Sequence, residues 1–350
     1  MARVKELFFY LSGEHDILPY AEVRAILEAE RFTFKNTVVL PHVLCLESNV
    51  NAVLPIINRS CFTKVCGLVI IKCYPSDAAI IRAVDEADLS QYLKKGQTFS
   101  VKIKRTTGSS IDVSKVENMI GKMVLRKIPD VKVKLANPEV TFFGISLQNL
   151  FILGQKLGEP SREFLRKKSS VRPFTHPSSI SPKIARGMVN LARVSRNSLV
   201  LDPFCGTGSF LTEAGFIGCR TLGSDIDPQM IWRTKQNLTF FNIPWSGLVI
   251  SDAECLPFLN VDGIVTDPPY SRASSTHGRF TITLITGFLA QAWEVLPRGG
   301  YISIAVPDYL QIKEIIKDLG YTISENYFVR EHKSLTREIL VLRKSPGACF

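Results

Sequence analysis

Hydrophobic and polar positions follow short strand-like and helix-like blocks through the front half of the chain. Alternating apolar positions predict a strand over Lys5–Leu11, and apolar residues at helical spacing predict a helix over Leu18–Glu30. Ser76 or Asp77 is placed to cap a later helix. The remaining predicted strands are Asn36–Leu46, Phe62–Tyr74, Thr98–Lys104, Val131–Leu135, Glu139–Ser146 and Asn149–Gln155, and the remaining helices are Val50–Arg59, Pro75 to about Leu89, and Val113–Arg126. This pattern predicts a small α+β assembly with two parts that meet near Tyr74.

The back half alternates buried strands with helices, and each of four successive strands ends in or beside an acidic residue. A helix is predicted over Pro182–Arg193. The four strands and their acids are Ser198–Leu201 with Asp202, Thr221–Ser224 with Asp225, Leu248–Ile250 with Asp252, and Ile264–Thr266 with Asp267. In open α/β sheets, ligands bind at the carboxyl ends of the strands. The four acids are therefore predicted to line one ligand site.

The first of these strands opens into Asp202-Pro203-Phe204-Cys205-Gly206-Thr207-Gly208, and a helix is predicted from Ser209. A strand, a glycine turn and a helix N-terminus form the dinucleotide-type arrangement. Leu211 stands where the third glycine of G-x-G-x-x-G belongs, which argues against NAD and favours a smaller ligand. Asp225 is suited to accept hydrogen bonds from ribose hydroxyls. Asp252 is suited to bind an adenine amino group.

The fourth strand delivers the tetrad Asp267-Pro268-Pro269-Tyr270, which suits a flat exocyclic amine. The Asp267 carboxylate can accept one amine hydrogen and the Pro268 carbonyl the other, and proline places no competing N–H beside that carbonyl. The ring of Tyr270 can stack on a nucleobase, which is worth about 1–3 kcal/mol per base. The alternative is a simple strand-ending turn, because Asp and Pro are common turn residues.

Composition indicates an ordinary globular protein. The chain has 350 residues, 45% of them hydrophobic and 21% charged, a length that suggests two or three domains. No apolar run is long enough to span a membrane, and the first residues lack the apolar core of a signal peptide. We therefore predict a cytoplasmic protein without a membrane partner.

Eight cysteines raise the question of zinc or disulfides. They form no C-x-x-C pair, and most lie in apolar runs, as Cys45 and Cys73 do. Free cysteine commonly packs as a small buried hydrophobe. We therefore predict that the cysteines pack in the core and that the chain has no metal site. A disulfide is an alternative if the source is a hyperthermophile.

Positive charge is concentrated in one region. Residues 91–172 hold 17 basic and 6 acidic residues, a surplus equal to the formal charge of +11 on the whole chain. Such a surplus is typical of a phosphate-rich partner, although a solvated basic face is the alternative. The candidate RNA contacts are Lys102, Lys104, Arg105, Arg126, Lys127, Lys167, Lys168 and Arg172.

Two groups of motifs resemble known families. The stretch Arg126–Pro138, with its Asn137-Pro138 turn, resembles the end of a THUMP domain, an RNA-binding module. The glycine turn, Ser224-Asp225-Ile226-Asp227, Ser251-Asp252-Ala253 and the tetrad resemble a class I S-adenosylmethionine-dependent amino-methyltransferase. Together with Arg172-Pro173-Phe174, Ser181–Arg186 and His332–Arg337, these motifs resemble the archaeal tRNA guanine-10 N2-methyltransferases over nearly the full length.

This resemblance implies an α/β class I, Rossmann-like methyltransferase domain after an α+β, THUMP-containing RNA-binding region. The implied sheet has seven strands, the last being Gly300–Val306, Tyr321–Arg330 and Arg337–Arg343, with the final two as a hairpin. The predicted limits are 1–75 for a ferredoxin-like α+β sub-domain, 76–156 for the THUMP domain, 157–181 for a basic linker and 182–350 for the methyltransferase domain.

The resemblance also implies the ligands. The methyl donor S-adenosylmethionine is expected at Asp202, Pro203, Phe204, Cys205, Gly206, Gly208, Asp225, Ile226, Asp252 and Ala253, and the guanine at the tetrad. The expected partners are tRNA and, as a hypothesis, a small zinc-binding activator subunit that docks on the edge strand Gly247–Ile250.

The function predicted is transfer of a methyl group to the exocyclic N2 of a tRNA guanosine, guanine 10, with one or two methylations left open. The alternatives are another tRNA guanosine, ribosomal RNA guanine N2, adenine N6, or a non-catalytic RNA-binding protein. The THUMP-like half and its charge favour structured RNA, because A-form RNA is recognised by shape and phosphate contacts.

Overall fold

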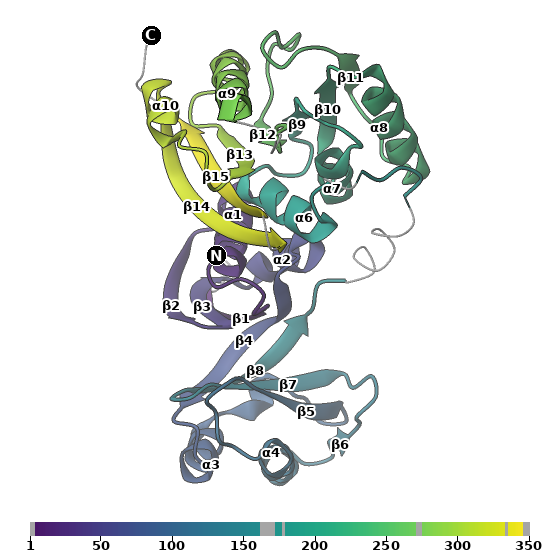
Figure 1. The fold of residues 1–350 in the computed structure, drawn as a ribbon. Helices are drawn as coiled ribbons and strands as arrows, with labels where there is room; N and C mark the ends of the chain where they lie inside the picture. Colours follow the sequence, from purple (N-terminus) through teal and green to yellow (C-terminus); the bar gives the residue numbers. More distant parts are fainter. Residues whose placement is uncertain (1–3, 162–171, 177–178, 271–274, 333–334, 346–350) are drawn as a thin grey trace. The chain divides into compact units, whose positions relative to one another are not determined.

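The computed structural model describes all residues except 1–3, 162–171, 177–178, 271–274, 333–334 and 346–350 (Figure 1). The chain forms two compact units, each assembled from separate stretches of sequence. Unit 1 comprises Met1–Glu14, Phe32–Ile57 and Thr63–Pro160, and unit 2 comprises His15–Arg31, Asn58–Phe62 and Ser161–Phe350. Among the described residues, no helix has the length and apolarity needed to cross a membrane.

Unit 1 is built on an eight-stranded sheet with the strand order β2-β3-β1-β4-β8-β7-β5-β6. The strands are β1 (Val4–Leu11), β2 (Phe34–Leu40), β3 (Val43–Asn49), β4 (Thr63–Cys73), β5 (Thr98–Arg105), β6 (Lys132–Val133), β7 (Val140–Ser146) and β8 (Phe151–Gly158). β5 pairs in parallel with β6 and β7, and the other pairs are antiparallel. The helical segments are η1 (Val50–Ala52), α2 (Val53–Arg59), α3 (Asp77–Glu86), η2 (Leu89–Gln91) and α4 (Val113–Lys127).

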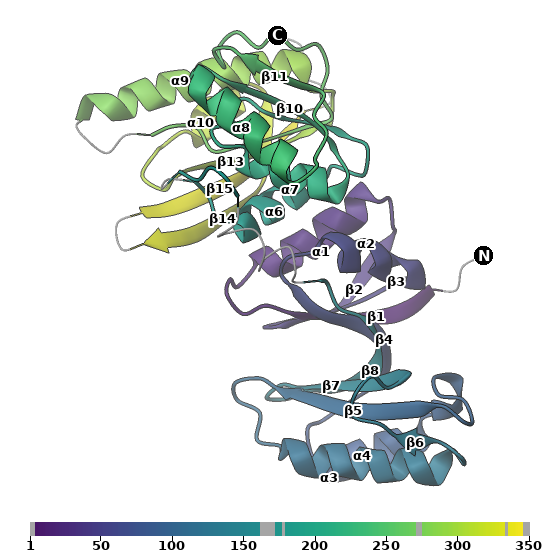
Figure 2. The same cartoon turned by 90° about the vertical axis from the view of Figure 1, so that its right-hand side faces the viewer.

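Helices α3 and α4 cover one face of the β5–β8 half of this sheet (Figure 2). Ser76 caps α3 by accepting a hydrogen bond from the Ala79 amide, as the sequence predicts. Apolar residues of both helices, such as Val84 and Ile120, join one buried core with Phe99 of β5. The helices are thus held by an amphipathic face packed on the sheet.

One predicted strand is wrong. Asn36–Leu46 forms two antiparallel strands, β2 and β3, in place of one. The break falls at Pro41-His42, where His42 has a φ of +69° and its carbonyl accepts from the Leu11 amide. Apolar residues continue on both sides of this turn, so the alternation alone does not reveal it.

Unit 2 contains a seven-stranded sheet with the order β11-β10-β9-β12-β13-β15-β14. The strands are β9 (Leu199–Asp202), β10 (Arg220–Asp225), β11 (Gly247–Ile250), β12 (Gly263–Thr266), β13 (Tyr301–Pro307), β14 (Tyr321–His332) and β15 (Leu335–Lys344). The helices are α1 (Leu18–Ala29), α6 (Pro182–Leu191), α7 (Ser209–Ile217), α8 (Pro228–Phe240), α9 (Ser275–Val295) and α10 (Lys313–Asp318). The first five strands of this order are parallel, and β14 and β15 form the antiparallel hairpin that the resemblance implies.

The central strands of the unit 2 sheet are buried on both faces. Successive residues of a strand point to opposite faces, so Leu340 and Leu342 pack in the core that contains α9, while Ile339 and Val341 pack in the core that contains α6. This explains why the sequences of β9 and β12 are mostly apolar.

Helix α1 lies early in the sequence, inside the predicted 1–75 sub-domain, but packs within unit 2. Its buried Glu22 carboxylate accepts hydrogen bonds from the Cys61 and Phe62 amides and from Asn190 of α6. At Gly187 of α6, an added Cβ would lie 2.7 Å from the Phe62 ring, so only glycine allows this close approach. Unit 2 therefore depends on residues that precede most of unit 1.

Candidate active site

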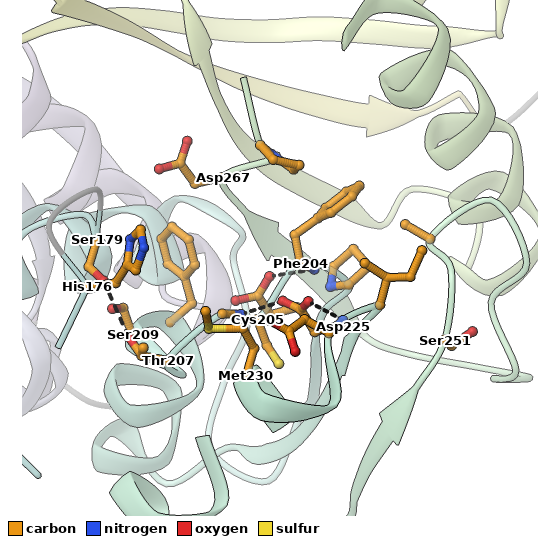
Figure 3. Close-up of a pocket in the computed structure, with 18 of the residues that line it drawn as sticks. His176, Ser179, Phe204, Cys205, Thr207, Ser209, Asp225, Met230, Ser251 and Asp267 are labelled. Atoms are coloured by element: carbon orange, nitrogen blue, oxygen red, sulfur yellow. Dashed lines mark hydrogen bonds between the residues drawn. The ribbon is translucent and has the colours of Figure 1, made fainter. Parts of the chain in front are cut away.

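The carboxyl edge of the unit 2 sheet carries a cavity of about 630 Å³ (Figure 3). Asp202 ends β9, Asp225 ends β10, Asp252 follows β11 and Asp267 follows β12. The four strands run parallel, so these ends meet at one edge, and all four acids line this cavity. The volume lies in the range of about 300–1,000 Å³ that is typical of small-molecule sites.

Most of the predicted donor and amine residues line the cavity. The predicted residues that line it are Asp202, Pro203, Phe204, Cys205, Gly206, Asp225, Ile226, Asp252, Ala253, Asp267 and Pro269. Gly208, Pro268 and Tyr270 lie next to lining residues in the chain. Thr207, within the predicted turn Asp202–Gly208, also lines it. The lining residues that were not predicted are His176, Ser179, Ile180, Ser209, Phe210, Asp227, Met230, Ser251, Glu254 and Leu284.

The glycine turn folds the loop after β9 tightly against β10. Gly206 and Gly208 have φ angles of +51° and +79°, which glycine adopts without the strain of a Cβ atom. The Gly206 amide donates to the Asp225 carboxylate at 2.9 Å, and a Cβ at Gly208 would lie 3.0 Å from Thr234. Gly208 is the N-cap of α7, so the first turn of this helix, with its free backbone amides, begins beside the cavity.

Asp202 forms the floor of the site and is 1% exposed. It accepts hydrogen bonds from the Thr266 hydroxyl at 2.8 Å and the Phe204 amide at 3.2 Å. Burial raises the pKa of the Asp202 carboxyl to about 8, and the nearby charges of Asp225 and Asp267 act in the same direction. The side chain is therefore mostly protonated at neutral pH.

Asp202→Asn is expected to flatten the pH dependence of stability. The wild-type carboxyl is protonated in the folded chain up to about pH 8 but ionised in the unfolded chain above about pH 4, so stability falls as pH rises through this window. Each pKa unit is worth about 1.4 kcal/mol, and each kcal/mol about 2–4 °C of melting temperature. Thermal melts between about pH 5 and pH 8 measure the effect, with the exposed Asp318→Asn as control. Parallel pH profiles for wild type and Asp202→Asn would contradict it.

The Asp225 side chain lines the cavity and is fixed by two hydrogen bonds. Its two carboxylate oxygens accept hydrogen bonds from the amides of Gly206 and Asp227, at 2.9 and 3.0 Å. Burial raises the pKa of the Asp225 carboxyl, and the two hydrogen bonds oppose this rise only in part. Asp252 is exposed, and its carboxylate accepts from the Glu254 amide at 2.9 Å, which fixes the loop after β11.

Asp267 is paired with a cation that sequence reasoning did not place in the site. Its Oδ2 lies 3.1 Å from Nη2 of Arg337, and the two side chains are 14% and 5% exposed. The Arg337 guanidinium also lies 5.9 Å from the centre of the Tyr270 ring. In Figure 3 the Asp267 carboxylate and Ser251 lie toward opposite sides of the cavity. Arg337 belongs to a motif used for the family resemblance, but no local signal shows its contact with Asp267.

Polar side chains gather at the end of the cavity near α7 (Figure 3). The hydroxyls of Ser179 and Thr207 lie 3.3 Å apart, and Arg172 donates to Ser209 at 2.9 Å. Burial lowers the pKa of Arg172. Ser179 lies just inside the segment predicted as a linker, which has no helical or strand period to reveal a role in the site.

The predicted RNA contacts lie in different surroundings. Lys102, Lys104 and Arg105 are exposed on β5. Arg126 pairs with Asp85 at 3.2 Å, and the Lys127 amine donates to backbone carbonyls at the end of α3. Lys167 and Lys168 lie outside the described residues.

Metal chemistry finds no support in the described part of the chain. No group of three or more His, Cys, Asp or Glu side chains there is arranged to hold a metal ion. The described cysteines are free, and Cys45, Cys61, Cys66, Cys205 and Cys219 are buried as predicted.

Two family models match parts of the chain. Residues 169–338 match the family model of RMKL-like methyltransferase domains, and residues 75–149 match the THUMP domain. The crystal structure of TrmN from Thermus thermophilus is similar in fold, with a TM-score of 0.54 and 20% identity over 97% of this chain and 99% of that chain. The predicted fold class, a Rossmann-like methyltransferase domain with a THUMP domain, is confirmed.

Two relatives are similar over nearly their whole length. The tRNA (guanine(10)-N2)-dimethyltransferase of Methanothermobacter thermautotrophicus is 35% identical over 97% of this chain and 99% of its own length. The enzyme of the same name from Methanocaldococcus jannaschii is 31% identical over 96% of this chain and 99% of its own. The resemblance predicted from the motifs is thus confirmed, and the chain belongs to the tRNA (guanine(10)-N2)-dimethyltransferase family.

Proposed function

We propose that the protein transfers methyl groups from S-adenosylmethionine to the exocyclic N2 of a guanosine in tRNA, guanine 10. The observation that carries this proposal is that Asp267 lines the same cavity as Gly206 and Asp225. An amine acceptor and a nucleoside-binding wall therefore share one site. The names of the relatives from two archaea support the substrate and the position.

The cavity fits the donor in volume and in chemistry. Asp225 would accept hydrogen bonds from the ribose hydroxyls, and the apolar side chains of Ile226 and Ala253 would contact the adenine. Asp252 would accept from the adenine amino group. The cluster of Ser179, Thr207 and Ser209, together with Arg172 and the N-terminus of α7, would hold the charged amino-acid end of the donor. This assigns Arg172 to the donor in place of the RNA.

Bound S-adenosylmethionine supplies a methyl group on a cationic sulfur, which leaves as a neutral thioether. Asp267 and the Pro268 carbonyl would accept the two hydrogens of the guanine N2 amine. Its lone pair is delocalised into the ring, so these hydrogen bonds favour a pyramidal nitrogen with the lone pair toward the methyl group. Holding two reactants in line can lower a barrier by about 7–11 kcal/mol. The amine proton released after transfer goes to Asp267 or to solvent.

Mass spectrometry of nucleosides tests the reaction directly. Unmodified tRNA is treated with enzyme and donor, digested and compared with tRNA in which guanine 10 is replaced by adenine. We expect N2-methylguanosine and N2,N2-dimethylguanosine only from the first tRNA. Methylation of both tRNAs at another guanosine would support the alternative target, and methylated adenine would support the adenine N6 alternative.

We propose that the exposed face of β5 in unit 1 contacts tRNA phosphates. Phe99 and Ile103 of this strand are buried against α3 and α4, so the alternating Lys102 and Lys104 lie on the opposite, exposed face. Two ammonium groups on one strand face, in the most basic part of the chain, suit a phosphate backbone.

Reversing both charges with Lys102→Glu and Lys104→Glu is expected to weaken tRNA binding about tenfold. The slope of log affinity against log salt should also fall by about 0.7–0.9 for each phosphate that the double variant no longer neutralises. Fluorescence anisotropy with labelled tRNA over a salt series measures both values. The matched control is Arg82→Glu with Lys122→Glu, two exposed cations on α3 and α4. Equal reductions of affinity in both double variants would contradict a specific role for β5.

We further propose that a small zinc-binding activator subunit docks on β11. This strand is an edge of the unit 2 sheet, and Ile250 at its end is 59% exposed. An apolar edge strand has unpaired backbone groups that a second chain can pair with. Size-exclusion chromatography of the chain with and without the subunit tests this, and an unchanged elution volume for the mixture would count against it.

A further inference from the structure

We propose that Arg337 is a positioning residue that orients both Asp267 and Tyr270 for the acceptor base. The proposal rests on the methyl transfer proposed above. It assigns to one guanidinium the task of fixing the amine acceptor and the stacking ring in a single arrangement.

Strand topology brings Arg337 to the site from a distant part of the sequence. β13 lies between β12, which delivers Asp267, and β15, which carries Arg337. Arg337 pairs in register with Pro307, the last residue of β13, so it lies at the carboxyl edge where β12 also ends. Its guanidinium lies 3.1 Å from the Asp267 carboxylate.

The neighbouring residue shows that this orientation is specific. Glu338 contacts Asn326 at 3.0 Å and Lys313 at 2.7 Å. Successive residues of a strand point to opposite faces, so Arg337 and Glu338 serve two different clusters. Arg337 is 4% exposed, and a cation this buried requires an anionic partner.

The pairing has two consequences for catalysis. A guanidinium that contacts Oδ2 restricts the rotation of the Asp267 side chain and favours its ionised form, which is the form that accepts amine hydrogens. The same guanidinium, 5.9 Å from the Tyr270 ring centre, is within the distance of a cation–π contact. Because one rigid, planar guanidinium makes both contacts, the position of the Asp267 carboxylate relative to the Tyr270 ring is fixed.

Arg337→Gln and Arg337→Lys test the proposal. In Arg337→Gln we expect kcat to fall about 100-fold, KM for tRNA to change only a few fold, and the acid limb of the pH–kcat profile to move up by about one pH unit. Arg337→Lys restores the charge but not the planar fork, so it should recover the position of the acid limb and only part of kcat. Both are measured on the full chain with unmodified tRNA, after calorimetry shows that each variant binds the donor.

Arg343→Gln is the matched control. Arg343 is exposed on the same face of β15 at the other end of the strand, so its removal should leave kcat and the pH profile unchanged. A wild-type kcat and acid limb in Arg337→Gln would overturn the proposal. A fall in kcat with an unmoved acid limb, equal in the Gln and Lys variants, would also overturn it by indicating a general packing role. Wild-type turnover in Asp267→Ala would instead refute the role of Asp267 as amine acceptor, and absence of N2-methylguanosine after treatment with the wild-type protein would refute the proposed function itself.

Discussion

Asp267→Ala is expected to lower kcat for tRNA methylation about 100-fold or more, while the affinity for the donor changes only a few fold. The substitution removes the acceptor for one amine hydrogen, and with it the hydrogen bond that directs the nitrogen lone pair. The donor contacts proposed at Asp225 and Ala253 lie elsewhere on the cavity wall and stay intact. Single-turnover methylation of unmodified tRNA measures the rate, and calorimetry measures donor binding.

The controls separate chemistry from folding. Asp267→Ala leaves the buried Arg337 without this carboxylate, so a thermal melt must accompany each rate. Asp267→Asn keeps the shape of the side chain and tests the charge, and Asp318→Ala makes the same change at an exposed position of α10. Turnover near that of wild type in Asp267→Ala, with a folded protein, would refute the assignment.

Much of the site follows from the sequence because parallel strands share an edge. Asp202, Asp225, Asp252 and Asp267 each stand at the end of an apolar run. The four parallel strands are neighbours in the sheet, so these ends meet at one edge. The glycine turn could be predicted for a similar local reason, since Gly206 and Gly208 adopt backbone angles that other residues avoid.

Other contacts could not be predicted because they join residues far apart in the sequence. Arg337 meets Asp267 only because β15 is inserted next to β13, and the alternation of β15 does not show its neighbour. Asn190 meets Glu22 across a separation of 168 residues. At His42, local chemistry gave too weak a signal, because a two-residue turn interrupted an otherwise continuous apolar run.

The contact between Glu22 and Asn190 indicates that α1 is a structural part of unit 2. Glu22 is 0% exposed, and its carboxylate accepts from Ser60 at 2.6 Å, the Cys61 amide at 2.9 Å, the Phe62 amide at 3.0 Å and Asn190 at 2.7 Å. Two of these donors are backbone amides that cannot turn toward another acceptor. A buried donor left unsatisfied costs about 1–3 kcal/mol.

Glu22→Ala is therefore expected to lower the free energy of unfolding of unit 2 by about 3 kcal/mol or more. The three tryptophans, Trp232, Trp245 and Trp293, all lie in unit 2, so their fluorescence during urea denaturation reports this unit separately. Glu22→Gln keeps one acceptor oxygen and should be destabilised less, and Glu294→Ala, exposed within α9, should change the midpoint little. An unchanged midpoint in Glu22→Ala would contradict the buried network. A lower urea midpoint of the tryptophan fluorescence in Glu22→Ala would mean that helix α1 stabilises unit 2, the methyltransferase unit.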